Sequence, residues 1–377
     1  MSFSEIALSL VMIFMKSRLF LIILTYAIGF FISLQLVGQT TTMVILNLEE
    51  RERLKIQFAE DESVRKLGDS ILHLANEALF LQPRPLEVVY YEGLLDNDPR
   101  RIDTEKSFKD IDATANLIYA SYISDDAKYG QKATEFVKAW VQTYVPTGNP
   151  INENKFVSIF WAYYLFKYHF NKQDQQLVEN WIRSIVRFEM DREHTPNNNW
   201  QAKRLKIIGL IGCVLDDATM QEFSVHGFKE YINIAYFADG TSRDLLQRDA
   251  LHYHVSGIKP CLSVFINLSK FNPAFDLYTY QGENGGSIKK SMEYVIPYIK
   301  VEKEHLEWVN TKVELDKKRA EAGLAKYQPG MPFDPRKAIP TLEWACFFQR
   351  DWYTLIDTNG SYTSTWVGLL NSPAIRE

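Results

Sequence analysis

The residues best suited to chemistry lie in one short stretch, "RDALHYH", which interrupts an apolar run. It holds Arg248, Asp249, His252, Tyr253 and His254, in a chain with only 7 histidines. If the stretch is one helix, Arg248 and His252 share a face, and Asp249 and Tyr253 share the neighbouring face. A nearby cation favours the phenolate of a tyrosine, so the pattern predicts Tyr253 as a proton-transfer group. The alternative is a buried tyrosine whose hydroxyl is hydrogen-bonded to a neighbour.

The same stretch is a poor metal site. Two histidines two residues apart diverge by about 200° on a helix. No cysteine or carboxylate cluster with metal-ligand spacing accompanies them. The motifs GxSxG, GxGxxG, HExxH and the Walker loop do not occur. We therefore expect neither a metal nor a cofactor.

Two other polar stretches stand out. "TPNNNWQAKR" places three asparagines, including Asn198 and Asn199, directly before Trp200. One asparagine is enough to cap the following helix. The additional amides could bind a carboxylate or hydroxyl of a substrate. The second stretch, "PTGNPINENK", indicates a turn followed by a helix cap.

The composition excludes some classes of protein. The net charge is −5, which argues against a general nucleic-acid binder but allows a polyanion in a local basic groove. Aromatic residues reach 14%, which suits stacking on sugar rings as well as core packing. The three cysteines, Cys213, Cys261 and Cys346, lie in apolar surroundings and are expected to be buried free thiols.

The N-terminus is typical of an export signal. Lys16 and Arg18 follow Met15, a possible start, and precede an apolar run from Leu19 to Val37. We expect a signal peptide over residues 1–38 with cleavage near Gly38–Gln39, and a periplasmic or secreted bacterial protein with no membrane contact afterwards. An uncleaved membrane anchor is the alternative, because the run is long enough to span a bilayer.

The elements that would position these residues are helices. Apolar residues recur at three- and four-residue steps over 112–125, 128–144, 155–170, 175–191, 200–215, 220–236 and 288–309. Short polar breaks such as "EHTPNNN" and "QGENGG" separate them. We expect one domain over residues 39–377 with an all-α fold, an incomplete (α/α)n toroid of stacked helical hairpins. An irregular helical bundle is the alternative.

Three stretches follow one another along the chain: "PTGNPINENK", "NNNW" before "KRLKIIGLIG", and "DGTSRDLLQRDALHYH". Their order resembles that in the alginate lyase superfamily, which includes polysaccharide lyase families 5 and 38. The resemblance covers roughly residues 85 to 350. It implies an enzyme that cuts a 1,4-linked polyuronate, alginate or glucuronan, by β-elimination. In that reaction a base removes the C5 proton, the neighbouring carboxylate is neutralised, and an acid protonates the departing O4.

The resemblance also implies roles for single residues. Tyr253 is the candidate base and acid, and Asn198 neutralises the carboxylate. Arg248 favours the phenolate or binds carboxylate, although family 5 carries its arginine at the position of Leu246. Tyr90 and Tyr91 fall where family members have aromatic residues on a lid. The remaining candidates for substrate contact are Trp200, Lys203, His252, His254 and Arg350.

One position departs from the family pattern. Family 5 has a histidine where this chain has Asn199, with Lys203 one helical turn further on. Elimination from guluronate needs a base and an acid on opposite faces of the sugar, whereas one tyrosine can serve both steps on mannuronate or glucuronate. We therefore expect syn-elimination on those polymers.

Two rival functions remain. The departure at Asn199 also fits a non-catalytic polyuronate-binding protein with a degenerate cleft. A helical sugar hydrolase needs two opposed carboxylates, and the available aspartates are Asp239, Asp244 and Asp249.

Overall fold

A computed structural model describes residues 43–94, 97–357 and 365–376. All of these belong to one compact unit, Thr40–Glu377. The expected signal peptide, the alternative anchor and the cleavage site lie outside the described residues. Within the described ranges, no helix combines the length and apolar character needed to cross a membrane.

Almost all regular structure is helical. The α-helices are α2 (Leu48–Glu60), α3 (Glu62–Ala78), α4 (Pro99–Ser107), α5 (Lys109–Ile123), α6 (Ala127–Thr143), α7 (Pro150–Glu153), α8 (Val157–Phe166), α9 (Lys172–Met190), α10 (Asn199–Val214), α11 (Ala218–Ala235), α12 (Arg243–Arg248), α13 (Leu251–Phe271), α14 (Ile288–Ile299), α15 (Glu314–Glu321), α16 (Ile339–Ala345), α17 (Thr354–Asp357), α18 (Trp366–Leu370) and α19 (Pro373–Arg376). The 3-10 turns are η1 (Asn154–Phe156), η2 (Lys167–His169), η3 (Ala325–Tyr327), η4 (Pro335–Lys337) and η5 (Arg350–Tyr353). The strands β1 (Leu306–Glu307) and β2 (Met331–Pro332) form one short antiparallel pair.

The helix starts follow from the local sequence. Asn47 forms a capping box with Glu50 at the start of α2. Asn171 and Asp217 accept backbone N–H bonds at the starts of α9 and α11. These side chains satisfy donors that a helix end leaves unpaired. These local contacts therefore fix where the capped helices begin.

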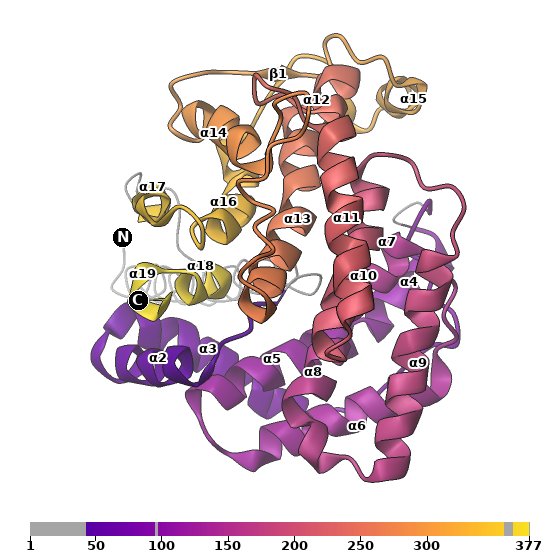
Figure 1. The fold of residues 1–377 in the computed structure, drawn as a ribbon, viewed down its shortest axis with the longest axis vertical. Coiled ribbons are helices and arrows are strands. Elements are labelled where there is room, and N and C mark those ends of the chain that lie inside the picture. Colours follow the sequence, from indigo (N-terminus) through magenta and orange to yellow (C-terminus); the bar gives the residue numbers. More distant parts are fainter. Residues whose placement is uncertain (1–42, 95–96, 358–364, 377) are drawn as a thin grey trace, which may run out of the picture. The chain divides into compact units, whose positions relative to one another are not determined.

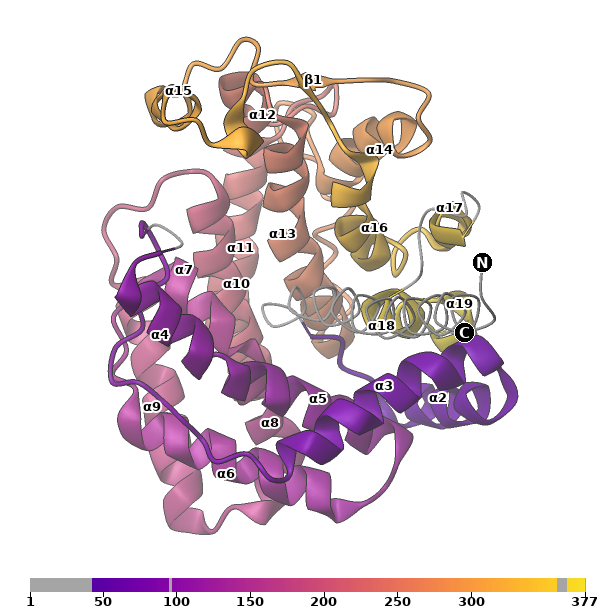
Figure 2. The ribbon, with the colours of Figure 1, turned by 180° about the vertical axis from the view of Figure 1, so that it is seen from behind.

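Consecutive helices pack as hairpins, among them α2 with α3, α5 with α6, and α10 with α11. Helix α13 packs along α10, and Figure 1 shows α10, α11 and α13 side by side. Figure 2 shows α3, α5, α6 and α8 as a second group of packed helices. The prediction of an all-α, incomplete (α/α)n toroid is confirmed.

Aromatic and aliphatic side chains fill the spaces between these helices. Trp140, Trp161 and Trp344 are fully buried. Edge-to-face contacts join Trp140, Phe156 and Trp181, with ring centroids 5.1 and 6.0 Å apart along the chain of contacts. Such pairs stabilise beyond the area they bury. The three cysteines are buried free thiols, as predicted.

Two helix predictions were wrong in detail. The stretch 288–309 is not one helix, because α14 ends at Ile299 and the backbone of Val301 is left-handed, with φ 58°. "RDALHYH" is not one helix either. Asp249 has φ 51° and ends α12, and α13 begins at Leu251. Such a φ costs a non-glycine residue energy and is held by surrounding contacts.

Candidate active site

The break at Asp249 sets the geometry around Tyr253. The carbonyl of Asp249 accepts the backbone N–H of Trp308 at 2.6 Å, and its carboxylate accepts that of Asn310 at 2.8 Å. Because the helix stops here, Arg248 and His252 do not share a helix face. The predicted i,i+4 pairing within this stretch is therefore wrong, and loop contacts 60 residues away in the chain replace it.

Helix α13 is buried on most sides but opens along one stripe. From Leu251 to Ser263 only His252, Tyr253, Ser256 and Lys259 keep exposed surface. At 100° per residue these four lie within a sector of about 120°. Tyr253 thus lies on the partly exposed stripe of α13 together with other polar groups, and is not buried in the core.

Arg248 reaches Tyr253 from the end of α12. Its guanidinium carbon lies 4.1 Å from the centroid of the Tyr253 ring. Its Nη1 donates to both oxygens of Asp316, at 2.7 Å each, and Asp316 is buried. The ion pair holds the guanidinium against the ring and occupies part of its hydrogen-bonding capacity.

Tyr327, which no sequence pattern singled out, is a further polar neighbour of Tyr253. It belongs to a small buried cluster with Ala250 and Trp308, against which Tyr253 packs. Burial first, and then hydrogen bonding and proximity to Tyr253, raises the pKa of Tyr327 to about 12. Tyr327 therefore stays a neutral hydroxyl that can donate to the oxygen of Tyr253.

His252 is held by a buried carboxylate. Its Nδ1 lies 2.8 Å from Oε2 of Glu307, and its backbone N–H donates to Oε1 at 2.8 Å. Burial alone would raise the pKa of Glu307, but the hydrogen bonds and charge of His252 outweigh it and the net shift is downward. An ionised carboxylate only accepts, so Nδ1 carries a proton, and in the neutral form of the ring Nε2 is then an acceptor.

Glu307→Gln tests this arrangement. The amide can satisfy the His252 backbone N–H only by turning its NH2 toward Nδ1, which moves the ring proton to Nε2. If Nε2 accepts a hydrogen bond from the sugar, the KM for the polymer rises about tenfold while kcat changes little. Steady-state kinetics measure this, and an unchanged KM would remove His252 from the substrate contacts.

His254 points the other way. It is buried, its Nδ1 lies 2.8 Å from Oγ of Ser242, and its Nε2 lies 3.1 Å from the carbonyl of Ser291. Burial lowers its pKa to about 4. Both ring nitrogens are thus occupied inside the protein, so the structure places His254 behind α13 and not among the cleft residues.

The asparagines before Trp200 do cap α10. Asn198 is the N-cap, and its Oδ1 accepts the backbone N–H of Trp200 at 2.9 Å. The cap occupies the oxygen and leaves the Nδ2 donors of the amide, which are the atoms that suit a carboxylate. Asn199 is the partly buried first residue of α10, and the guanidinium carbon of Arg192 lies 5.4 Å from the Trp200 ring centroid.

Asn198 and Tyr253 lie at corresponding ends of two helices that pack together. The chain runs along α10, back along α11, and through α12 into α13, so α10 and α13 start at the same end (Figure 1). Lys203 lies one turn after Asn199 on the same face of α10. Burial, and then the charge of Lys155, lowers the pKa of Lys203 to about 8.

The loop between α3 and α4 carries the two expected lid tyrosines. Asn152 fixes this loop, because its Oδ1 accepts the backbone N–H of Tyr91 at 3.2 Å. The Tyr91 ring lies between two cations, with Lys155 Nζ 4.2 Å and Arg101 Cζ 4.8 Å from its centroid. Tyr90 is 44% exposed. The "PTGNPINENK" stretch therefore holds the α3–α4 loop in place as well as making a turn.

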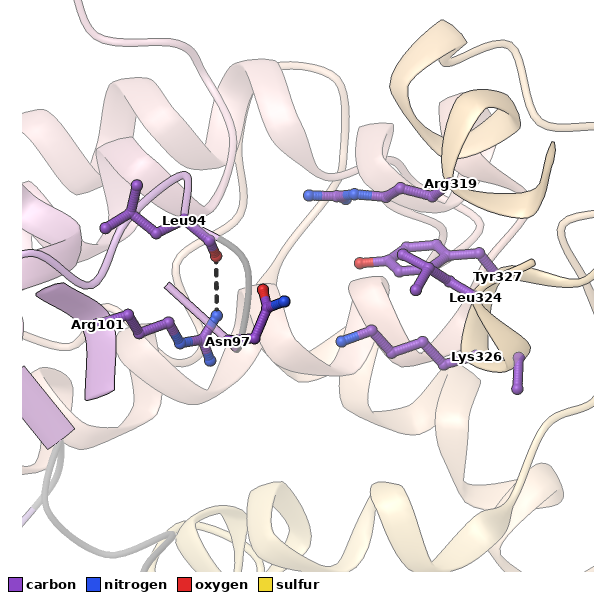
Figure 3. A pocket seen from close by; sticks show the side chains of 8 residues that line it. Leu94, Asn97, Arg101, Arg319, Leu324, Lys326 and Tyr327 are labelled. Carbon is purple, nitrogen blue, oxygen red and sulfur yellow. Dashed lines mark hydrogen bonds between the residues drawn. The ribbon is translucent and has the colours of Figure 1, made fainter. Parts of the chain in front are cut away.

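A cavity of about 650 Å³ lies between this loop and the α15–η3 region. Figure 3 shows Arg319, Lys326 and Tyr327 pointing across it toward Leu94, Asn97 and Arg101. Three of the lining side chains are cationic. Because Tyr327 also adjoins Tyr253, a basic cavity opens next to the candidate proton-transfer group.

A pair of buried carboxyl groups lies behind the site. Glu153 of α7 accepts hydrogen bonds from the Tyr144 hydroxyl and the backbone N–H groups of Thr147 and Gly148. Its other oxygen, and both oxygens of Glu189 at the end of α9, are buried with no donor among the described residues. Burial, and then the charge of Glu153, raises the pKa of Glu189. A proton shared by the pair supplies the missing donor and joins α7 to α9.

The other candidates take less central places. Arg350 is exposed at the first residue of η5. Asp239 accepts from Thr241 in a turn, at 2.9 Å, and Asp244 lies 3.9 Å from Arg248. Together with Asp249, which holds Asn310, these aspartates serve local structure. Among the described residues, no group of three or more histidine, cysteine or acidic side chains is arranged to hold a metal ion.

The structure thus combines an incomplete helical toroid with a partly exposed tyrosine, Tyr253, next to a basic cavity. The alginate lyase family model matches residues 81–306, and the chain belongs to this family. It is a polysaccharide lyase. No curated protein matched the chain.

Two solved structures of low sequence identity share the fold. A crystal structure of an alginate lyase from Bacteroides ovatus is 16% identical, with a TM-score of 0.58 over 89% of this chain and 97% of that one. A variant of alginate lyase A1-III complexed with a tetrasaccharide is 15% identical, with a TM-score of 0.50 over 77% and 91%. The A1-III enzyme from Sphingomonas species A1 is 15% identical, with a TM-score of 0.48 over 76% and 92%.

Proposed function

We propose that this lyase cuts mannuronate- or glucuronate-type polyuronate by syn-β-elimination, with Tyr253 as both base and acid. The observation that carries the proposal is the placement of Tyr253. It faces the cleft between Arg248 and the Tyr327 hydroxyl, at the end of α13 that corresponds to the Asn198 cap of α10. A guanidinium and a hydroxyl donor are the groups that stabilise a phenolate.

The reaction then proceeds in two proton transfers. The Tyr253 oxygen takes the C5 proton while the Nδ2 donors of Asn198 bind the sugar carboxylate, on which negative charge develops. The C4–O4 bond breaks, its electrons leave on O4, and a C4–C5 double bond forms. Tyr253 returns the proton to O4. Arg248 is engaged with Asp316, so we assign it to Tyr253 and not to the substrate carboxylate.

The choice of polymer is tested by absorbance of the unsaturated product. Purified protein is mixed separately with polymannuronate, polyguluronate and glucuronan. We expect absorbance to rise with polymannuronate or glucuronan, because a single tyrosine serves only substrates whose C5 proton and O4 leave from the same face. A higher rate on polyguluronate than on both others would overturn the syn mechanism. A folded protein that binds but cuts none of the three would favour the binding-protein alternative.

We also propose export, because Lys16, Arg18 and the apolar run that follows have the pattern of a signal peptide. The expected mature chain begins near Gln39 and is found in the periplasm or the medium. N-terminal sequencing of protein from producing cells checks this, and an intact, membrane-associated chain would contradict it.

A further inference from the structure

Four lysines gather inside the toroid, deeper along the helices than Tyr253 and Asn198. They are Lys155 of η1, Lys203 and Lys206 of α10, and Lys259 of α13, here called the lysine cluster. Lys206 is close enough to interact electrostatically with all three others. From Asn199 to Lys206 the rise along α10 is about 10 Å. The cluster is therefore separate from the proton-transfer centre but continues the same cleft.

The lysine cluster concentrates amines in a buried region, where the charged form of an amine is energetically unfavourable. Burial lowers the pKa of each of the four amines, to about 8 for Lys203, and neighbouring lysines lower those of Lys203, Lys206 and Lys259 too. Burial also raises the pKa of two carboxyls that act on the cluster, Asp112 and Glu343, to about 7. Arg101 adds a further positive charge beside Lys155, which Glu105 partly offsets.

Three of these amines are not satisfied by partners among the described residues. Among the described residues, Lys155, Lys203 and Lys259 form no ion pair or hydrogen bond, although Lys155 stacks under Tyr91. One oxygen of Asp112 is buried without a donor. The same three lysines keep part of their surface open, as expected for groups that line a narrow cleft. Lys203 shares the Asn199 face of α10, and Lys259 shares the His252 face of α13.

The lysine cluster does not by itself stabilise the folded protein. Unpaired buried amines of like charge destabilise the protein, and apolar side chains of similar size would pack there at no electrostatic cost. A ligand with several negative charges would supply the missing partners and restore the charge of the amines. The basic cavity lined by Arg101 and the cation-flanked Tyr91 lead toward the cluster, so an extended anionic chain suits it better than a compact anion.

We propose that the lysine cluster is a binding subsite for carboxylates of sugar units next to the bond that is cut, and that its occupancy draws a proton into the protein. The proposal rests on the proposed function for the identity of the ligand. It adds a second site of carboxylate recognition, beyond Asn198, that selects a run of consecutive acidic sugars over an isolated one.

The test uses binding without turnover. Tetramannuronate, tetraglucuronate and their carboxyl-reduced, neutral counterparts are titrated by calorimetry into the Tyr253→Phe protein at pH 8.5. Each titration is repeated in two buffers of different ionisation enthalpy, which gives the number of protons taken up. The variants Lys203→Met and Lys259→Met remove one amine each and keep the side-chain length. Lys172→Met, at an exposed position on α9, is the matched control.

The proposal expects an acidic tetrasaccharide to bind with uptake of roughly half to one proton, since Lys203 is then mostly neutral before binding. Lys203→Met and Lys259→Met should each weaken binding about tenfold or more, and Lys203→Met should abolish the uptake. Lys172→Met should change neither. The neutral tetrasaccharides should bind all proteins equally weakly.

The outcomes separate this proposal from the proposed function. If the unmodified enzyme cuts a uronate polymer but both lysine variants bind within twofold of their parent, or no proton is taken up, the subsite is overturned and the lyase mechanism stands. Lysine-dependent binding by a chain that cuts no polymer would support the subsite and overturn the mechanism. Absence of any binding to both acidic tetrasaccharides would overturn the subsite. Circular dichroism of each variant excludes misfolding as the cause of a loss.

Discussion

Tyr253→Phe should lower kcat on the preferred uronate polymer by roughly a thousandfold or more, because in the proposed mechanism one group carries both proton transfers, and general acid–base catalysis contributes up to about 10⁴-fold. The ring and its packing against Trp308 and the Arg248 guanidinium are retained, since only the hydroxyl is removed. Polymer binding should therefore stay within about threefold. Product absorbance gives the rate, and calorimetry gives the affinity.

Tyr168→Phe is the matched control, because it removes the same atom from a tyrosine that is 74% exposed. It should leave both rate and affinity unchanged. A Tyr253→Phe enzyme that keeps a tenth or more of the activity would assign the proton transfers to another group. His252, held by Glu307 next to Tyr253, would then be the first alternative.

We expect the protein to lose stability as the pH rises, and Glu189→Gln should make this loss much smaller. The folded protein keeps a proton on Glu189 up to a pKa of about 8, against 4.5 for the ordinary side chain. Between these values the folded state binds one more proton than the unfolded state. Stability from this pair is thus complete below about pH 4.5 and falls by about 1.4 kcal/mol per pH unit until about pH 8.

Thermal unfolding followed from pH 5 to 9 measures this effect. The unmodified protein should lose about 2–3 °C of Tm per pH unit more than Glu189→Gln between pH 5 and 8. The comparison of the two proteins isolates the pair, because Asp112 and Glu343 titrate equally in both. Glu222→Gln, at an exposed position on α11, should follow the unmodified protein. Parallel curves for all three would show that Glu153 and Glu189 do not share a proton.

The carboxyl pair has a functional consequence through its position. Glu153 immediately precedes Asn154 and Lys155, and Glu189 ends the helix whose following loop carries Asn198. Ionisation of both carboxyls would place two unpaired charges between α7 and α9. We therefore expect Lys155 and Asn198, which we propose to bind carboxylates, to lose their fixed positions at the same pH at which the stability falls.

The sequence by itself determined the helical class and most helix starts, because period and capping are local properties. The asparagines before Trp200 predict a helix cap, and Asn198 caps α10 in the structure. The same locality explains the errors. The sequence around Asp249 does not indicate a left-handed backbone at this residue. The contacts that hold Asp249 in this conformation come from residues 308 and 310. For that reason, the prediction that Arg248 and His252 share a helix face was wrong.

Only the tertiary structure decided which polar groups meet. His252 and His254 are only two positions apart in sequence, yet His252 is partly exposed and pairs with Glu307 while His254 is buried against Ser242. Tyr327 and Asp316 reach the Arg248–Tyr253 pair from more than sixty residues away. For the lysine cluster, a signal existed in the single cations within apolar runs such as "LKIIGLIG" and "SGIKPCLSV". The role of a single buried lysine cannot be inferred until its packing neighbours are known. Its electrostatic interactions depend on distances to other charges in space and not on separation along the chain.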